Sequence, residues 1–581
     1  MTAAAPAVRR GWVEKWVPGI AAMRTYQRAW LSRDLVAGIV LVTLLVPQGM
    51  AYAELAGLPA ITGLYTTVVC LVAFSLVGSS PVLILGPDSA LGPMIAATIL
   101  PLAGGNDEQK IALAGMLALL VGAITVAAAI VRLGFVADLL SSPVRTGYLA
   151  GLAITILIGQ LPKLFGFSTD ASGLIDEAVT FVQDLDETNY WALAIGLVSL
   201  AIILGLRVVA PRTPGILVAV VVSLVASVVL DLAARGVDVI GALPQGFPLP
   251  SIPIVPLADI PVLLAAAVGI TLVAVGDTIS TSSAFASRGG YEVDTNQELG
   301  GIGTANIATG LFSGFPVTSS SSRTAVAFQS GAKTQLTGLI AAALVLLMLV
   351  FLPGLVQAMP QPVLAAIVIA ASVTLFDGAE LARLYRARTA EFALALACLL
   401  GVAFVGVLQG IVIAVVLSVL YIFKRVWAPY SAILGRVPEM PGWHDVERYP
   451  VTTQVPGLLI IRWSAPLFFA NANQFRDRIR AAVRSADVAP RWILIAAEPI
   501  SDIDITASEM LLDLDAELMA DGIFLAFAEV QSAVRDWITR YDILDTSQGT
   551  RSFASVQEAV DAFHRATAKG VAPDTGTEPL T

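Results

Sequence analysis

The sequence predicts an α-helical polytopic membrane protein of fourteen transmembrane segments in two matching halves, followed by a cytoplasmic α/β domain. The chain of 581 residues is 56% hydrophobic and 13% charged, with a mean hydropathy of +0.80. Bilayer-spanning segments require that much apolar surface, whereas a soluble core does not. The apolar character stops near Lys424, and a stretch of ordinary soluble composition continues to near Lys569.

Two polar, proline-containing breaks interrupt the apolar part, at residues 86–89 and 315–323. Each opens an apolar segment that is too short to cross a bilayer alone. Such segments at matching positions of two halves indicate a transporter whose half-helices meet near the midplane. Two helix N-termini that face each other bind an anion through backbone N–H groups and helix dipoles. The breaks therefore favour anion transport.

The number of spans follows from the apolar segments and their flanking charges. Seven segments on each side give an inverted repeat, because an odd unit reverses its orientation; Pro87 and Pro316 then each open the third helix of a half. The segments begin near Leu35, Ile61, Ser89, Ile111, Val144, Tyr190, Thr213, Ile260, Glu298, Ser321, Leu336, Pro362, Ala390 and Gly410.

Basic residues predict the orientation, because they are enriched in cytoplasmic loops. An even number of spans then leaves both termini in the cytoplasm, and we expect a multi-pass protein of the inner (plasma) membrane without a cleavable signal peptide. The loop charges, Arg145 and Arg207 among them, fall inside, and only Lys110, Lys163 and Arg235 fall outside with the acidic loop 170–187. The basic residues that precede the first span are Arg9, Arg10, Lys15, Arg24, Arg28 and Arg33.

Composition excludes several functions. The formal net charge is −10, with acid concentrated in one loop and in the C-terminal domain, which argues against nucleic-acid binding. His444 and His564 lie outside the membrane part, so a membrane histidine relay or metal site is excluded, and Cys70 and Cys398 fit small core residues. The sequence shows no nucleotide loop, metal cluster or nucleophile set, so we expect neither an enzyme nor a cofactor.

The first break supplies Asp88, Ser89 and Ala90 as candidate substrate-binding residues. Pro87 suits a helix start, Ser89 offers a hydroxyl, and the small Ala90 lets a substrate approach the backbone. Asp88 would repel a bound anion unless it is protonated or paired with a cation. The alternative is an ordinary junction in which Asp88 caps the helix and points away.

The second break supplies the hydroxyls of Ser320, Ser321 and Ser322, and Arg323 just inside the following helix. An arginine this deep in a membrane is costly unless it is paired with an ion or a substrate, and arginine holds oxyanions through several donors. Together with two helix N-termini, Arg323 suits a mono- or divalent anion. The alternative is an arginine that snorkels at the end of a span.

Acidic residues are candidates for the coupling-ion site. Asp277 closes the eighth predicted span, and Thr281 lies four residues later on the same helix face. Such a carboxylate can titrate or hold Na⁺, and loading it removes its repulsion of the anion. It can also serve as an ion-pair partner of Arg323 in the empty state. Glu54, near the outer end of the first span, is an alternative proton carrier or a solvated interfacial residue.

Several motifs resemble those of the SulP family of sulfate-permease-like anion transporters. Residues 34–65 are similar to its first-helix signature, residues 86–90 to its third-helix start, residues 288–299 to the loop before its ninth helix, and residues 322–335 to its tenth-helix block. The resemblance implies a seven-plus-seven inverted repeat in which a core domain moves against a gate domain, and a homodimer. It also places Asp277 where the family has an acid linked to Na⁺ or proton coupling.

The soluble part alternates strands and helices, as in a small α/β domain, and resembles the STAS domain of SulP proteins. We predict two strands within 456–469, a helix at 474–484, a strand at 492–497, a helix at 506–519, a strand at 523–529 and a helix at 532–541. The usual Asp-Ser-Thr-Gly turn is here Asp504-Ile505-Thr506-Ala507, which makes a phosphoswitch at 505 doubtful. The predicted domains are a cytoplasmic segment 1–33, a transport domain 34–430, a linker 431–452, the STAS domain 453–567 and a disordered tail 568–581.

The prediction is secondary active transport of a small inorganic oxyanion by alternating access, with sulfate uptake coupled to H⁺ in first place. Alternatives are a Na⁺- or H⁺-coupled bicarbonate or dicarboxylate transporter, and a passive anion channel or exchanger of the same fold. Asp277 favours a transporter, because a channel gains little from a carboxylate beside its anion path. A nucleobase transporter would not need Arg323, and a STAS-based sensor is weakened by Ile505.

Overall fold

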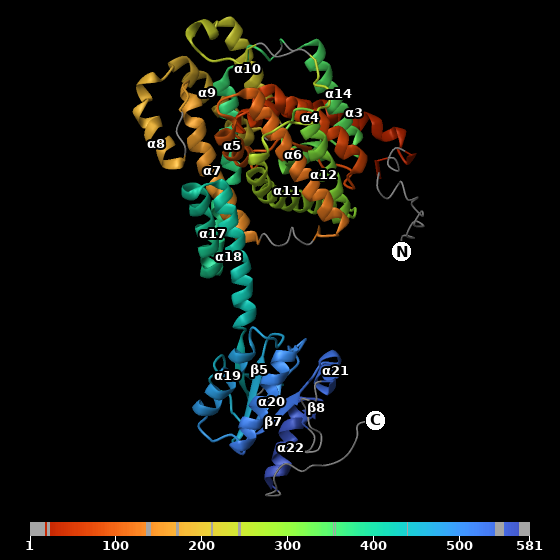
Figure 1. The fold of residues 1–581 in the computed structure, drawn as a ribbon, viewed down its shortest axis with the longest axis vertical. Helices are drawn as coiled ribbons and strands as arrows, with labels where there is room; N and C mark the ends of the chain where they lie inside the picture. Colours follow the sequence, from red (N-terminus) through yellow and green to blue (C-terminus); the bar gives the residue numbers. More distant parts are fainter. Residues whose placement is uncertain are drawn as a thin grey trace. The chain divides into compact units, whose positions relative to one another are not determined.

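The computed structural model describes residues 18–19, 24–134, 141–169, 173–210, 213–241, 246–352, 354, 356–438, 440–540 and 551–568 (Figure 1). The first three basic residues of the charge pattern and the predicted tail from 569 onward lie outside the described residues. The chain divides into two compact units, Met1–Ser418 and Val419–Thr581.

Fourteen helices of the described chain begin within a few residues of the fourteen predicted starts. Among the described residues, seven helical stretches are by length and composition able to cross a membrane on their own. The helices are α3 (Leu31–Leu55), α4 (Ala60–Val77), α5 (Gly92–Ala103), α6 (Asp107–Ile130), α7 (Ser142–Phe165), α9 (Tyr190–Val209), α10 (Gly215–Val229), α11 (Ile260–Gly289), α12 (Thr295–Leu311), α13 (Ser321–Gln329), α14 (Leu336–Phe351), α15 (Gln361–Leu375), α17 (Thr389–Leu400), which a π-helix (Gly401–Val405) continues, and α18 (Val407–Trp427). Two amphipathic helices, α8 (Leu174–Gln183) and α16 (Gly378–Ala387), lie between them in sequence.

Side-chain caps and left-handed residues set many helix ends. Asn106, Asn189 and Asp294 accept hydrogen bonds from the first-turn N–H groups of α6, α9 and α12. Helix α5 ends at Gly104 and helix α11 at Gly290, both with positive φ. These polar caps satisfy backbone groups that lipid leaves without partners.

The helices of the first unit form two groups. In the first group, α3, α4, α5 and α6 pack with α11, α12, α13 and α14, and in the second group α7, α9, α10, α15 and α17 pack with one another. Helix α3 also contacts α10 and α15, so it touches both groups. Helices α3 and α4 cross very closely, because a Cβ on Gly63 would lie 1.9 Å from the carbonyl oxygen of Gly49. Small residues permit such close crossings in membranes.

A buried carboxylate ties the start of α3 to the start of α14. Asp34 is fully buried and accepts hydrogen bonds from the backbone N–H groups of Lys333 and Thr334, from the hydroxyls of Thr334 and Thr337, and from Tyr26. Five donors satisfy this carboxylate, so its role is to hold the two helix ends together.

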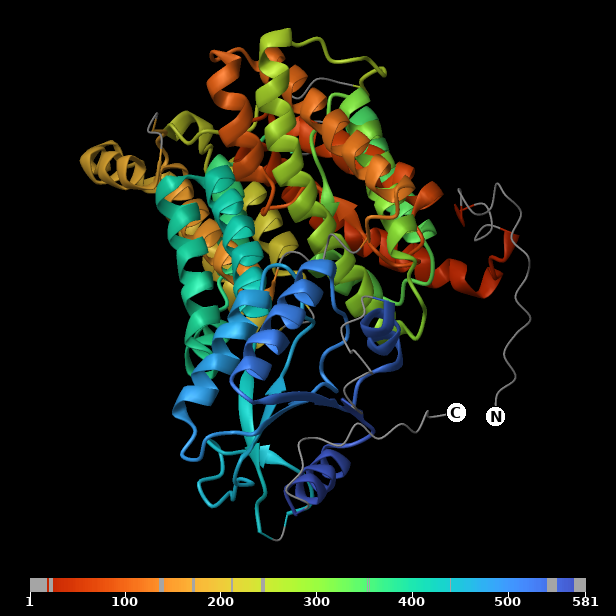
Figure 2. The same cartoon turned by 60° about the horizontal axis from the view of Figure 1, so that its bottom comes forward.

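The second unit is a six-stranded sheet in the order β4-β3-β5-β6-β7-β8. Strands β5 to β8 are parallel, and β3 pairs antiparallel with both β4 and β5. Two apolar clusters lie on opposite faces of the sheet, one with α19, α20 and α21 and the other with α22 (Figure 2). The bounds are β3 (Ser431–Gly435), β4 (His444–Asp445), β5 (Leu458–Trp463), α19 (Ala472–Ser485), β6 (Trp492–Ala496), α20 (Ile505–Ala520), β7 (Phe524–Ala528), α21 (Ser532–Arg540), β8 (Ser552–Phe553) and α22 (Val556–Ala568).

The predicted secondary structure of this unit needs two corrections. Residues 431–452, predicted as a linker, contribute β3 and β4 to the sheet. Residues 456–469, predicted as two strands, contain one strand, β5, because Pro466 has no N–H group with which to continue a ladder. Asp504 caps α20 by accepting from the Ala507 N–H group at 2.8 Å, and the side chain of Ile505 is 61% exposed.

Candidate functional site

The two breaks pair with each other through the backbone. Strand β1 (Leu85–Gly86) lies antiparallel to β2 (Thr318–Ser319), with Gly86 opposite Thr318. All four residues are buried. This pairing satisfies the buried backbone groups of the two breaks, which is the condition for irregular chain inside a membrane protein. The short helices α5 and α13 follow the two strands.

In the first break the helix starts later than predicted. Helix α5 begins at Gly92, not at Pro87, because the carboxylate of Asp88 accepts a hydrogen bond from the Ala90 N–H group at 3.0 Å. Asp side chains that bond the backbone two residues on favour a turn over a helix. Residues 88–91 are therefore a turn, and Asp88 faces this turn rather than serving as the N-cap of α5.

In the second break α13 begins at Ser321, as predicted, with Ser320 as its N-cap. The Ser320 and Ser322 hydroxyls lie 3.1 Å apart, and the Ser321 hydroxyl lies 2.7 Å from that of Thr281 on α11. Thr281 thus bonds to the start of α13, although it was predicted as a coupling-ion residue.

Arg323 is fully buried in the first turn of α13, so it does not snorkel to the surface. Its Nη1 donates to the Pro87 carbonyl at 2.6 Å, and its Nη2 lies 3.9 Å from an Asp88 carboxylate oxygen. Its Nε and Nη2 have no hydrogen-bond partner among the described residues. The ion-pair partner of Arg323 is thus Asp88, whereas a pair with Asp277 was the alternative role considered for that carboxylate. Glycine at Gly86 lets the guanidinium approach the first break closely, because a Cβ there would lie only 3.0 Å from Nη1.

A cavity of about 840 Å³ lies against both breaks. Seven of the ten predicted site residues line it, whereas Arg323 and Thr281 lie behind its wall. It extends to the connection between α9 and α10, where Thr213 and Pro214 line it. The seven are Asp88, Ser89, Ala90, Asp277, Ser320, Ser321 and Ser322.

Asp277 lies in the middle of α11, not at its end as predicted, because the small residues after it continue the helix to Gly289. Its carboxylate faces the charged groups Asp88, Arg145 and Arg323 in the described part of the chain. Glu54 lies in the last turn of α3 and is half-buried. Lys163 is the cationic side chain that interacts with it electrostatically. Glu54 is not among the cavity-lining residues.

Sequence reasoning missed several cavity-lining side chains. Arg145 and Arg207 were counted only as loop charges, and Tyr148 had no signal at all. Gln48 and Tyr52 belong to the first-helix motif, and Tyr52 faces Ser89. The motif was the one signal that pointed to these two residues.

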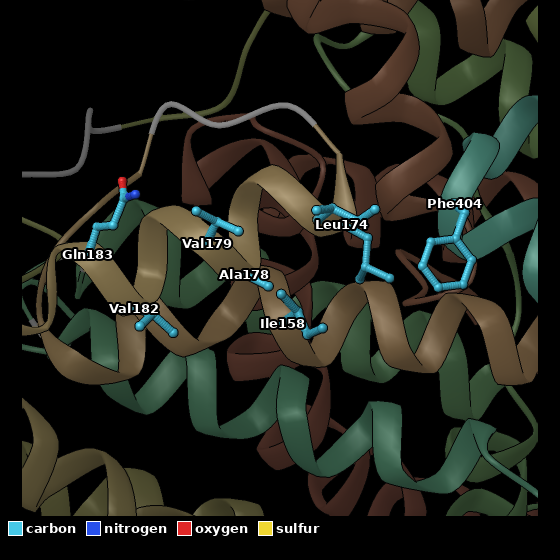
Figure 3. Close-up of a pocket in the computed structure, with 8 residues that line it drawn as sticks. Ile158, Leu174, Ala178, Val179, Val182, Gln183 and Phe404 are labelled. Carbon is cyan, nitrogen blue, oxygen red and sulfur yellow. The ribbon is translucent and has the colours of Figure 1, made fainter.

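A second hollow does not suit an anion. A groove of about 530 Å³ lies between α7, α8 and the π-helix, and Figure 3 shows Phe404 facing its α8 wall. Seven of its eight lining residues are apolar and the eighth is Gln183. A charged ligand would find no counter-charge there among the described residues.

Comparison with known proteins assigns the chain to a family. The sulfate permease family matches residues 31–398, and the STAS domain matches residues 449–559. The chain belongs to the sulfate permease family. A probable sulfate transporter of Mycobacterium tuberculosis (strain CDC 1551 / Oshkosh) is 40% identical over 550 residues, which cover 95% of this chain and 98% of that protein. Sulfate transporter 4.1, chloroplastic, of Arabidopsis thaliana is 31% identical, over 94% of this chain and 82% of that protein.

Solved structures show the same fold. SLC26A9 matches with a TM-score of 0.87 at 22% identity, over 96% of this chain and 94% of that one. The transmembrane domain of the cyanobacterial bicarbonate transporter BicA matches with a TM-score of 0.60 at 23% identity, over 68% of this chain and 98% of that one. The predicted family and fold class are confirmed: the chain is a helical multi-pass membrane transporter of anions with a STAS domain, and it is not an enzyme.

Proposed function

We propose that the protein takes up sulfate together with H⁺ by alternating access. The observation that carries this proposal is the content of one cavity, where serine hydroxyls from two backbone-paired breaks meet two carboxylates, Asp88 and Asp277. Hydroxyls and helix-start N–H groups suit a dehydrated oxyanion. The relatives named as sulfate transporters support sulfate as the anion.

In this proposal Arg323 attracts the anion electrostatically without lining the cavity. Its buried charge lies next to the first break, where it favours an anion in the cavity without being one of the lining groups. Substrate-binding residues are then Ser89, Ala90, Ser320, Ser321 and Ser322, and Asp88 also lines the cavity, 3.9 Å from the guanidinium.

Asp277 is the proposed coupling residue. An ionised carboxylate in the anion cavity repels the substrate, so loading a proton removes that repulsion and links the two fluxes. Asp88 lies 3.9 Å from Arg323, so in this proposal it is the fixed partner of that cation and not the coupling residue. We assign Glu54 and Thr281 lesser roles, because neither lines the cavity.

The proposal includes the arrangement in the membrane. The first helix group is the moving core and the second is the gate, related within an inverted repeat, and the protein is a homodimer of the inner membrane with both termini in the cytoplasm. The cavity then opens to the cytoplasm, because it extends to the predicted cytoplasmic connection between α9 and α10. The predicted domain boundaries at 34, 430, 453 and 567 are part of this proposal.

The test is radiolabelled sulfate uptake into proteoliposomes under an imposed inward proton gradient, repeated with a Na⁺ gradient. We expect accumulation with protons alone, and Asp277→Asn should abolish it. Glu54→Gln is the matched control and should keep at least half of the wild-type rate. Full gradient-driven uptake by Asp277→Asn would refute the coupling assignment. Absence of wild-type uptake under both gradients would move the proposal to bicarbonate or a dicarboxylate.

A further inference from the structure

Helix α7 hydrogen-bonds across the two helix groups at the edge of the cavity. Arg145 lies in the first turn of α7 and Tyr148 follows three residues later, so both are on one helix face, and both line the cavity. Arg145 Nη1 donates to the Ser280 hydroxyl on α11 at 2.8 Å. The Tyr148 hydroxyl donates to the Ala90 carbonyl at 2.9 Å. One face of α7, in the second group, thus hydrogen-bonds to two parts of the first group, α11 and the turn before α5.

The Tyr148 contact reaches the anion site itself. Tyr148 is buried, and the carbonyl that it holds follows Ser89 in the turn before α5. A tyrosine hydroxyl in such a position needs an acceptor, and Ala90 supplies it. When α7 moves relative to the first group, this bond must break.

The Arg145 contact lies beside the coupling carboxylate. Ser280 follows Asp277 by three residues on α11, hence on the same face, and Arg145 and Asp277 line one cavity. The charged groups that face Asp277 in the described chain are Arg145 from α7, Asp88 from the first break and Arg323 from α13. An ionised Asp277 therefore strengthens the hold of Arg145 on α11, and a neutral one weakens it.

We propose that Arg145 and Tyr148 form a two-point latch that keeps the anion site in the conformation seen here and opens when Asp277 is neutralised by its coupling ion. Both are positioning residues, since Tyr148 holds the Ala90 carbonyl and Arg145 holds α11. The dependence on Asp277 rests on the proposed function, whereas the two contacts between groups do not. The latch explains how binding of the coupling ion at Asp277 changes the freedom of the whole first group to move relative to α7.

The decisive experiment cross-links the latch in full-length protein. The Arg145→Cys/Ser280→Cys double variant is treated with a bifunctional methanethiosulfonate and assayed for sulfate uptake in proteoliposomes. We expect uptake below about a tenth of the untreated level, with recovery after reduction. Uptake at the full rate in the cross-linked protein would overturn the latch. The native Cys70 and Cys398 are both buried, which limits side reactions.

Two controls separate a latch from general damage. The single variant Arg145→Cys receives the same reagent, and the pair Ser79→Cys/Asp294→Cys lies within the first group, where the Ser79 hydroxyl contacts the Asp294 carbonyl at 3.4 Å. Cross-linking that pair should leave sulfate uptake at or above half of the untreated level. If wild-type vesicles accumulate no sulfate, the proposed function fails, and the cross-link test then uses the anion that those vesicles do take up.

A second measurement tests the role of Tyr148. Tyr148→Phe removes only the hydroxyl, and one neutral hydrogen bond is worth roughly a fivefold shift of an equilibrium. We expect a severalfold change in maximal uptake rate with little change in KM. Thr155→Val is the matched control, since that hydroxyl bonds Gly151 within α7. In sulfate exchange without a proton gradient, which does not require coupled accumulation, Arg145→Gln should change the rate less in an Asp277→Asn background than alone. Equal effects in both backgrounds would remove Asp277 from the latch.

Discussion

Replacing Arg323 by glutamine should weaken anion binding strongly. The side chain is fully buried, so water does not screen its charge at the protein surface. Its Nη2 lies 3.9 Å from Asp88, which lines the cavity, and one further contact layer puts a bound anion roughly 6 Å from the guanidinium. Two unit charges at that distance attract by about 3 kcal/mol at an effective dielectric of 20. Asp88 offsets part of this attraction.

The expected result is a loss of at least about tenfold in sulfate affinity, since 1.4 kcal/mol corresponds to about a factor of ten. The measurement is the KM of uptake in proteoliposomes, with thermal melting in detergent as the check on folding. Arg323→Lys keeps the charge but loses the planar donor that reaches Pro87. Its KM should therefore lie between those of the wild-type protein and Arg323→Gln. Arg383→Gln, on the exposed face of α16, is the control. A folded Arg323→Gln protein with wild-type KM would refute the electrostatic role.

Three further substitutions probe the frame around the site. Gly86→Ala puts a Cβ 3.0 Å from the Arg323 guanidinium, so uptake should fall at least fivefold while the protein still purifies as a folded species; undiminished uptake would show that the guanidinium has room to shift. Asp34→Asn replaces an acceptor oxygen by a donor among five donors and should cost about 2 kcal/mol, visible as a lower melting temperature. Gly63→Ala drives a Cβ to 1.9 Å from the Gly49 carbonyl and should abolish membrane accumulation, whereas normal expression would mean that α3 and α4 can separate.

The positions of the spans were predictable because apolar and polar segments contrast sharply along the chain. The breaks were predictable from proline, glycine and serine, and so was the start of α13 at Ser321. The start of α5 was not, since the bond from Ala90 to the Asp88 carboxylate competes with a helix and leaves no mark in composition. Thus local chemistry predicted where the chain stops being a regular helix, but not what it does there.

Long-range contacts were the other gap. The pairing of Leu85 with Ser319 joins residues from opposite halves through the backbone, which no side-chain pattern encodes. Arg145 was assigned to loop charge, because its partner Ser280 becomes visible only once α7 packs beside α11. Glu54 and Asp277 looked alike as intramembrane acids, and only the cavity separates them.

The short ladder between β1 and β2 has a consequence for how such a protein diversifies. The frame of the site is held by main-chain bonds, which every residue type except proline can make, while the groups that face the cavity are side chains. Exchanging a hydroxyl for another small group there alters the chemistry offered to the ligand without loosening the frame. One scaffold can therefore be retuned to different anions by a few substitutions, while the main-chain ladder that frames the site stays the same.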